Sequence, residues 1–382
     1  MAASEQRPRV LVTGASGFIA GHCILALLDE GYPVRGTVRS LRDEAKLRHL
    51  RGLTGKDEAR LELVEAELTR DTGWAEAVAG CRYVLHVASP FPATLPDDEA
   101  ELIVPAVEGT RRVLAACAAT GGGVARVVLT SSLAAIAYGH ETHGERVLTE
   151  EGWSNPDRCE PYQKSKTLAE RAAWDFVAAL PATQRFELAV INPGFVLGPL
   201  LSDVGGTSAE LIKRLLNRGM PACPRVGFAV VDVRDVARAH LLAMETPAAA
   251  GNRYIAAGDH MWLEEMAQIL ATEFNRYGYR VPTGRLPYWL LWLVARFDKT
   301  IRLTLASVGK RELVSHDKAR RELGWSTRAP EETLVDMGYS AIELGLAPDK
   351  IGRAERERRA GRPHPAPAPR RSEPTSARAS GH

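Results

Sequence analysis

The sequence is poor in cysteine, with five among 382 residues and no two of them in a Cys-x-x-Cys pair. An odd number of widely spaced cysteines predicts reduced thiols in the cytoplasm, and it argues against a disulfide framework or a zinc-binding module. The five are Cys23, Cys81, Cys117, Cys159 and Cys223. We therefore expect a cytoplasmic protein without a bound metal.

Long apolar runs are also missing. The most apolar stretch, Tyr288–Ala295, has eight residues, whereas a membrane-spanning helix needs about 20. The first predicted strand begins near Arg9, which leaves no room for the apolar part of a signal peptide. We expect a protein without a membrane segment, in which the stretch 288–295 is a buried or lobe-packing helix; contact with a membrane surface is the alternative.

Net charge is small, with 49 Lys and Arg against 47 Asp and Glu. Nine of the basic residues and four of the acidic ones lie in 348–382, so the preceding 347 residues carry a net charge of −3. A uniformly basic, nucleic-acid-binding surface is thereby excluded. The segment 348–382 is rich in Arg, Pro and Ala without an apolar period, which predicts a disordered tail.

Apolar stretches of strand length alternate with helical stretches through the first 250 residues. Such alternation predicts an α/β fold, the Rossmann type of doubly wound parallel sheet, with ligands bound where the strands end. Helical segments dominate afterwards and predict a smaller, mainly helical lobe that binds the substrate. The predicted domains are 8–250 for nucleotide binding, with 196–227 contributing to the lobe, 251–347 for the lobe and 348–382 for the tail.

A glycine-rich turn joins the first predicted strand to the first predicted helix. Gly14 permits a tight turn, and Gly17 lets the backbone approach a pyrophosphate. Because the turn follows a strand and opens a helix, it predicts a dinucleotide site. The second strand ends at Arg39, and Lys46 follows it. Cations at this place favour the 2′-phosphate of NADP(H) over the hydroxyl of NAD(H).

Tyr162 and Lys166 are four residues apart at the start of a strong helical run. This spacing places both side chains on one helix face, where an ammonium is expected to lower the pKa of the phenol and permit proton transfer. Ser131 and Ser132 follow the strand that ends at Thr130. A hydroxyl there can bind a substrate oxygen, and the order of the residues leaves open which serine does so.

Taken together, TGASGFIAG, TVR, HVASP, TSS, YxxSK and INPGFVLGP resemble the extended short-chain dehydrogenase/reductase family, and above all its dihydroflavonol-4-reductase-like branch of aldehyde and carbonyl reductases. The resemblance runs from about residue 8 to 347. It implies Tyr162 as proton donor, Lys166 as its partner and ribose ligand, and Ser132 as hydrogen-bond donor to the carbonyl. It also implies an NADP(H) site formed by Gly14, Ser16, Gly17, Phe18, Ile19, Arg39, Lys46, Glu67, Leu68, Val87, Ala88, Ser89, Tyr162, Lys166, Pro193, Gly194, Val196 and Ser208.

Three positions depart from the family pattern. Glu67 replaces an Asp near the adenine, Ala106 replaces an Asn found in many extended members, and Ala137 replaces an Asn that contacts the flavonoid in plant dihydroflavonol reductases. The last change argues against a dihydroflavonol substrate. The expected activity is thus NADPH-dependent reduction of an aldehyde or ketone, in a monomer or homodimer.

Other activities share these motifs. A sugar-nucleotide epimerase or a hydroxysteroid dehydrogenase/isomerase is the enzymatic alternative, although an epimerase that retains NAD favours an acidic residue in place of Arg39. A regulator that senses NADP without turnover is a further alternative, which the Tyr162–Lys166 pair argues against.

Several other residues are expected to be structural. His140 and His143 lie in a polar loop without a third ligand at zinc-site spacing. Asp232 and Asp235 open a helix, where carboxylates complement the helix dipole, and His86 is read as a buried strand residue. Three tryptophans are expected to pack the smaller lobe, namely Trp262, Trp289 and Trp292, with the alternative that one of them faces the substrate.

Overall fold

The structure is a computed structural model that describes residues 7–54, 60–90, 98–140, 147–203, 206–294, 296, 305 and 308–352. The side chains of Ala45, Lys46 and Val294 lie outside this description. So does the predicted tail from residue 353 onward.

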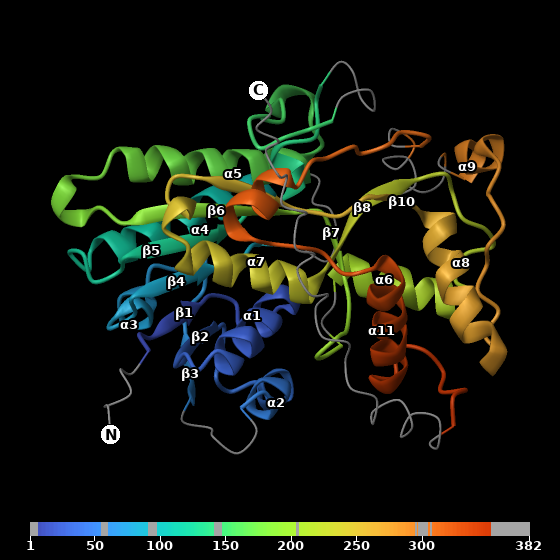
Figure 1. The fold of residues 1–382 in the computed structure, drawn as a ribbon, viewed down its shortest axis with the longest axis horizontal. Coiled ribbons are helices and arrows are strands. Elements are labelled where there is room, and N and C mark those ends of the chain that lie inside the picture. The colour runs from blue at the N-terminus through green and yellow to red at the C-terminus, as the bar shows by residue number, and fades with distance from the viewer. Residues whose placement is uncertain are drawn as a thin grey trace, which may run out of the picture.

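Seven parallel strands form the main sheet in the order β3-β2-β1-β4-β5-β6-β9 (Figure 1). Their bounds are β1 Val10–Val12, β2 Val34–Val38, β3 Leu61–Glu65, β4 Tyr83–His86, β5 Arg126–Thr130, β6 Glu187–Pro193 and β9 Arg253–Ala256. The chain runs outward from β1 to β3 and then returns to β4 on the other side of β1. Ligands of such sheets bind at this reversal, and the predicted doubly wound Rossmann fold is confirmed.

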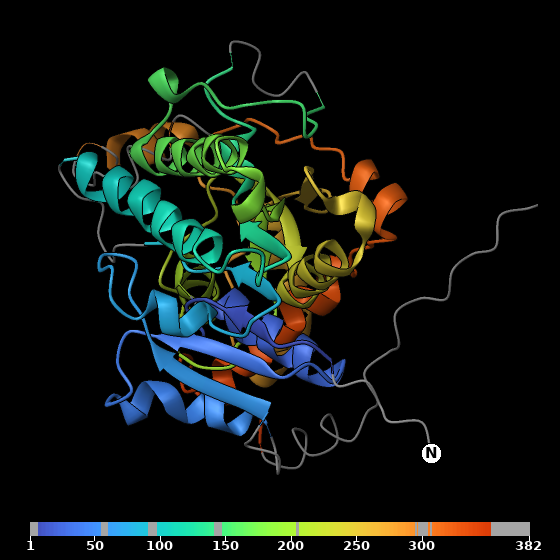
Figure 2. The same cartoon turned by 90° about the vertical axis from the view of Figure 1, so that its left-hand side faces the viewer.

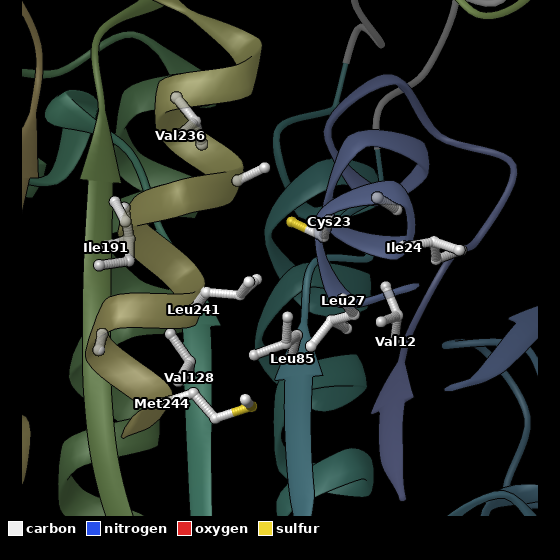
Figure 3. Close-up of a cluster of buried hydrophobic side chains, with 14 of the residues drawn as sticks. Val12, Cys23, Ile24, Leu27, Leu85, Val128, Ile191, Val236, Leu241 and Met244 are labelled. Carbon is white, nitrogen blue, oxygen red and sulfur yellow. The ribbon is translucent and has the colours of Figure 1, made fainter. Parts of the chain in front are cut away.

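Helices cover both faces of this sheet (Figure 2). One face carries α3 (Trp74–Val78), α4 (Ala100–Ala118) and α5 (Pro161–Ala178), and the other carries α1 (Phe18–Asp29), α2 (Glu44–Gly52) and α7 (Val233–Glu245). Because successive strand residues point to opposite faces, Leu11 belongs to the first core and Val12 to the second. Figure 3 shows Val12, Leu85 and Val128 of the sheet among side chains of α1 and α7.

The main sheet continues past the domain boundary that was predicted at residue 250. Strand β9 pairs with β6 from Val190 to Pro193. A single π-helical turn, Ala319–Leu323, and the fully buried Trp325 also pack into the core beside α1 and α7. A four-residue strand and one helical turn are too short to show a period, so the prediction from the sequence placed both in the smaller lobe.

A second sheet of three strands carries the smaller lobe. Its order is β10-β8-β7, with bounds β7 Phe195–Leu197, β8 Gly227–Asp232 and β10 His260–Trp262. Three helices share a separate core beside it, namely α6 (Gly206–Leu216), α8 (Leu263–Phe274) and α11 (Pro330–Glu343) (Figure 1). The lobe is therefore mainly helical, as predicted, although no local pattern indicated its short strands.

Helix α9 (Tyr288–Val294) is not packed as the sequence predicted. Leu291 is buried, but Tyr288, Trp289, Trp292 and Leu293 are exposed. The expectation that this stretch is a buried helix and that Trp289 and Trp292 fill the lobe is wrong, whereas Trp262 is buried. In the part of the chain that the structure describes, no helix has the length and apolar character needed to cross a membrane.

Candidate functional site

The glycine turn lies between β1 and α1 and is held against the end of β4. Gly14 has φ +68°, and a Cβ built there would lie 3.0 Å from the Cβ of Ala88. The Gly14 amide donates to the hydroxyl of Thr37 over 2.9 Å. Among the described residues no side chain caps the first turn of α1. The N–H groups of that turn are therefore available to an anion.

The residues after the turn connect the two lobes. Ile19 packs against the core of α1 and α7, whereas Phe18 packs against the core of the smaller lobe. Phe18 also meets the ring of His22 edge-on, with centroids 5.8 Å apart. Ser16 is partly exposed. The turn thus lies where the main sheet and the smaller lobe meet.

Two arginines, one within β2 and one directly after it, have different environments. Arg39 follows the carboxyl end of β2 and is exposed. Arg35 is buried and donates to the carboxylate of Glu62 and to the carbonyl of Ala79. Of the two, Arg39 is therefore the one that can meet a ligand at the strand ends. Lys46 belongs to α2, and its side chain lies outside the described residues.

The end of β4 contacts the glycine turn through Thr13. The Thr13 hydroxyl accepts a hydrogen bond from the Ala88 amide over 2.9 Å and lies 2.9 Å from Nδ1 of His86. His86 is buried, and desolvation lowers its pKa to about 3. It therefore stays neutral at physiological pH, in agreement with the predicted role as a buried strand residue. Val87 packs against the core beside α1.

Tyr162 and Lys166 occupy the first two turns of α5, which starts with Pro161 at its first position. The Nζ atom of Lys166 lies 5.9 Å from the ring centroid of Tyr162. It donates to the hydroxyl of Ser89 over 2.8 Å. A continuous series of contacts therefore runs from Tyr162 through Lys166 and Ser89 to the glycine turn.

The pKa values in this pair do not follow the expectation from the sequence. Desolvation raises the pKa of Tyr162 above its ordinary value, and a side-chain hydrogen bond with Ser132 partly offsets this effect. Desolvation lowers the pKa of Lys166 to about 8. The prediction of a lowered Tyr162 pKa is wrong for this structure, because desolvation disfavours the phenolate more strongly than the surrounding contacts stabilise it.

The two serines after β5 have different partners. Ser131 is buried and donates to the carboxylate of Glu170 over 2.5 Å. Ser132 accepts a hydrogen bond from the Ala134 amide over 3.1 Å and shares one with Tyr162. The tertiary structure thus brings Ser132, and not Ser131, to the phenol.

The residues expected to flank the adenine follow β3. The Glu67 carboxylate pairs with Arg70 at 3.4 Å and is about a third exposed. Leu68 packs against the core beneath α4. A Cβ on Gly109 of α4 would lie 2.9 Å from the Cβ of Leu68. The close approach of α4 therefore fixes the position of Leu68, one of the two residues expected to flank the adenine.

The residues expected to border the nicotinamide join the two sheets. Pro193 ends β6, and a Cβ on Gly194 would lie 2.1 Å from the carbonyl oxygen of Ala229. Only glycine fits such an approach. The Ser208 hydroxyl donates to the Val196 carbonyl over 2.6 Å. This contact brings the first turn of α6 to β7 at the same edge.

Two residues near Tyr162 were not predicted from the sequence. The Tyr138 hydroxyl donates to Glu312, whose carboxylate also accepts from the Ala229 amide. Desolvation raises the pKa of Tyr138 well above its ordinary value, and the nearby Glu312 and Tyr162 add to this effect. Glu312 comes from a short extended segment without an apolar period, so no sequence signal could have identified it.

The other candidates are structural or lie outside the description. Nε2 of His140 lies 2.8 Å from the Ile136 carbonyl oxygen, and His143 lies outside the described residues. Where the structure describes the chain, no group of three or more His, Cys, Asp or Glu side chains could hold a metal. Asp232 caps α7 by accepting from the Arg234 amide over 2.8 Å.

Comparison with known proteins gives consistent matches. The model of the NAD dependent epimerase/dehydratase family matches residues 10–257. Cinnamoyl-CoA reductase CAD2 of Medicago truncatula is 43% identical over 256 residues, which cover 66% of this chain and 76% of that protein. Tetraketide alpha-pyrone reductase 1 of Arabidopsis thaliana is 36% identical over 347 residues, covering 89% of this chain and 97% of that protein.

Among solved structures, yeast methylglyoxal/isovaleraldehyde reductase Gre2 complexed with NADPH has a TM-score of 0.73 at 28% identity. The match covers 88% of this chain and 99% of that chain. Gre2 of Candida albicans, also in complex with NADPH, has a TM-score of 0.72 at 28% identity, with the same coverage of both chains.

Proposed function

The chain belongs to the NAD dependent epimerase/dehydratase family, and we propose that Tyr162 protonates the oxygen of an aldehyde or ketone during NADPH-dependent reduction. The protein is an NADPH-dependent carbonyl reductase, in agreement with relatives that are named as reductases and with structures that contain NADPH. The proposal concerns the residues that carry out the reaction.

The observation that carries the proposal is the hydrogen bond between Ser132 and Tyr162. It brings two hydroxyl groups together at the ends of the parallel strands. One carbonyl oxygen can accept from both groups there. Ser132 polarises the carbonyl, and Tyr162 then gives up its proton as charge develops on that oxygen.

The protonation states suit reduction. Because the pKa of Tyr162 is raised, the phenol keeps its proton at neutral pH until a substrate oxygen takes it. The ammonium of Lys166, with a pKa of about 8, is available to stabilise the tyrosinate that remains. When bound, NADPH supplies the hydride that adds to the carbonyl carbon.

The residues of the turn fit a dinucleotide. Gly14 has a positive φ and no side chain, so the backbone of the turn can lie close to Ala88 and to a pyrophosphate. The first turn of α1 has no side-chain cap, so its N–H groups can donate to that pyrophosphate. Gly17, Ser16, Phe18 and Ile19 complete this turn.

The remaining cofactor contacts are proposed from position. Arg39, with Lys46, binds the 2′-phosphate at the end of β2. The adenine lies between Glu67 and Leu68. Ser208 reaches a phosphate of the cofactor. The other proposed residues follow the cofactor from the ribose to the nicotinamide: Val87, Ala88, Ser89, Lys166, Pro193, Gly194 and Val196.

We also propose a cytoplasmic location and a monomer or homodimer. All five cysteines carry free thiols, which agrees with a reducing compartment. The division into a nucleotide-binding domain, a substrate lobe and a tail stays a prediction, with β9 assigned to the main sheet and the 319–325 segment to the core beside it. An epimerase reaction is less well supported, because the exposed residue after β2 is Arg39 and the relatives are reductases.

Tyr162→Phe tests the proposal. The purified variant, beside wild type, is assayed for NADPH oxidation with a panel of aldehydes, ketones and a hydroxycinnamoyl thioester. Loss of the proton donor is expected to lower kcat by about 100-fold or more, while NADPH still quenches the tryptophan fluorescence. Near-wild-type turnover by the variant would rule out Tyr162 as the proton donor.

A further inference from the structure

Glu170 lies on the same face of α5 as the two proposed catalytic residues. Tyr162, Lys166 and Glu170 follow one another at intervals of four residues, so they are neighbours along that face. The Glu170 side chain is fully buried. A buried carboxylate is costly unless charged and hydrogen-bonding partners surround it, so its partners indicate what it holds together.

The Glu170 carboxylate has partners from several elements. Ser131 donates to Oε2 over 2.5 Å, and Nδ2 of Asn192 donates to the same atom over 2.8 Å. Nε1 of Trp174 donates to Oε1 over 3.3 Å. Arg253 forms the ion pair, with its Nε 2.5 Å from Oε1. The carboxylate therefore joins α5 to the ends of β5 and β6 and to β9.

Arg253 is itself held in place. Its Nη1 donates to the carbonyls of Glu150 and Gly152, over 3.0 and 2.8 Å. Its guanidinium lies 3.8 Å from the ring centroid of Trp153. Its Nη2 also donates to Oε2 of Glu170 over 3.3 Å. Since both side chains are buried and the guanidinium is held by two backbone carbonyls, the Glu170–Arg253 pair is a fixed support between α5 and β9.

This support reaches Ser132 from two sides. Asn192 uses its second Nδ2 hydrogen to donate to the Ser132 carbonyl over 3.1 Å. Ser131, which is bonded to Glu170, is the residue directly before Ser132. The carboxylate thus fixes the backbone on both sides of the Ser132 Cα, and it does so from the helix that carries Tyr162.

We propose that Glu170 is a positioning residue, which acts through Ser131 and Asn192 to hold the Ser132 hydroxyl at the distance from Tyr162 that carbonyl polarisation requires. The proposal rests on the proposed function of Ser132 and Tyr162. It assigns Ser131, the serine that does not reach the phenol, to the support of the one that does.

Ser131→Ala is the test with the least risk to folding, because it removes one hydroxyl and leaves the buried ion pair intact. It is expected to lower kcat about tenfold with little change in the KM for NADPH, as for a small displacement of a group that acts in the transition state. Ser340→Ala is the matched control. Ser340 is also buried and hydrogen-bonded, but it lies in the smaller lobe, so its loss should reduce stability and leave kcat unchanged.

A double-mutant cycle separates positioning from general destabilisation. If Ser131 acts through Ser132, Ser131→Ala has no further effect on kcat in a Ser132→Ala background. The proposal would be overturned if the loss of kcat in the double variant equalled the product of the two single losses. Full activity of Ser131→Ala alone would also overturn it. Full activity of Ser132→Ala would instead refute the proposed role of Ser132 and remove the positioning role with it.

Glu170→Gln gives a second measurement. The variant keeps the shape but loses the charge opposite Arg253, and kcat is expected to fall by about 100-fold with the NADPH Kd within about threefold of wild type. Wild-type kcat in a folded Glu170→Gln variant would contradict the proposal. If that variant does not fold, the Ser131 cycle decides.

Discussion

The ammonium of Lys166 donates a hydrogen bond of 2.8 Å to the hydroxyl of Ser89. This contact joins α5, which carries the proposed proton donor, to the end of β4, which contacts the glycine turn through Ala88 and Thr13. Since the turn is the proposed pyrophosphate site, Lys166 connects the proposed proton donor with the proposed cofactor site. The protonation state of Lys166 is therefore expected to affect turnover.

We predict that carbonyl reduction has a falling pH limb near 8. The charged form of Lys166 stabilises the tyrosinate left after proton transfer, and its pKa of about 8 means that this charge is present below pH 8 and lost above it. The kcat, measured at saturating NADPH and substrate from pH 6 to 10, should therefore decline as pH rises through 8. Lys166→Arg keeps its charge throughout this range, so the limb should disappear from whatever activity remains. A wild-type kcat that is constant to pH 10 would contradict this assignment.

Gly14→Ala is predicted to weaken NADPH binding by about tenfold or more and to destabilise the fold by about 1–2 kcal/mol, because the position has a positive φ and faces Ala88. Gly31→Ala is the matched control, since Gly31 has φ +83° but a Cβ added there would meet nothing within 4 Å. It should show an equal or smaller loss in urea unfolding, because only the φ effect applies there, and no loss in NADPH affinity. Equal NADPH affinity in the two variants would argue against a cofactor at this turn.

Arg39→Ala is predicted to raise the KM for NADPH by about 10- to 100-fold, the cost of losing a charge-assisted hydrogen bond to phosphate. The KM for NADH should change by less than about threefold, because NADH lacks that phosphate. Arg51→Ala, which removes an exposed arginine of α2 that pairs with Glu44, is the control for net charge. Equal losses with both cofactors would refute the assignment of Arg39.

Three buried histidines are predicted to make the protein less stable in acid. Desolvation lowers the pKa of His22 and His240 to about 4 and that of His86 to about 3. Between these values and the unfolded value near 6.5, the unfolded chain binds more protons, so stability is full above pH 6.5 and falls as pH decreases. Each histidine contributes up to about 1.4 kcal/mol per pH unit.

Urea unfolding at pH 7, 6 and 5 measures this slope. His240→Asn should reduce it by the contribution of one histidine. A slope between pH 7 and pH 5 that is the same in wild type and in His240→Asn would contradict the assignment of His240 as neutral in the folded state.

Much of the fold could be predicted because its signals are local. The alternation of apolar strand segments with helices determines a doubly wound sheet, and the glycine turn is recognisable because Gly14 and Gly17 are required within four residues. The spacing of Tyr162 and Lys166 fixes a shared helix face for the same reason. Shorter elements such as β9 were missed, since four residues show no period and their place depends on the strand beside them.

The sequence by itself determined which residue types stand at the ends of the strands. Only the tertiary structure decided which of them meet. It directed Ser131 to Glu170 and Ser132 to Tyr162, although the two serines are adjacent in the chain. It also reversed the expected pKa shift of Tyr162, because desolvation depends on everything packed around a group. Contacts such as Glu170 with Arg253 join residues 83 positions apart, and no local pattern encodes such a distance.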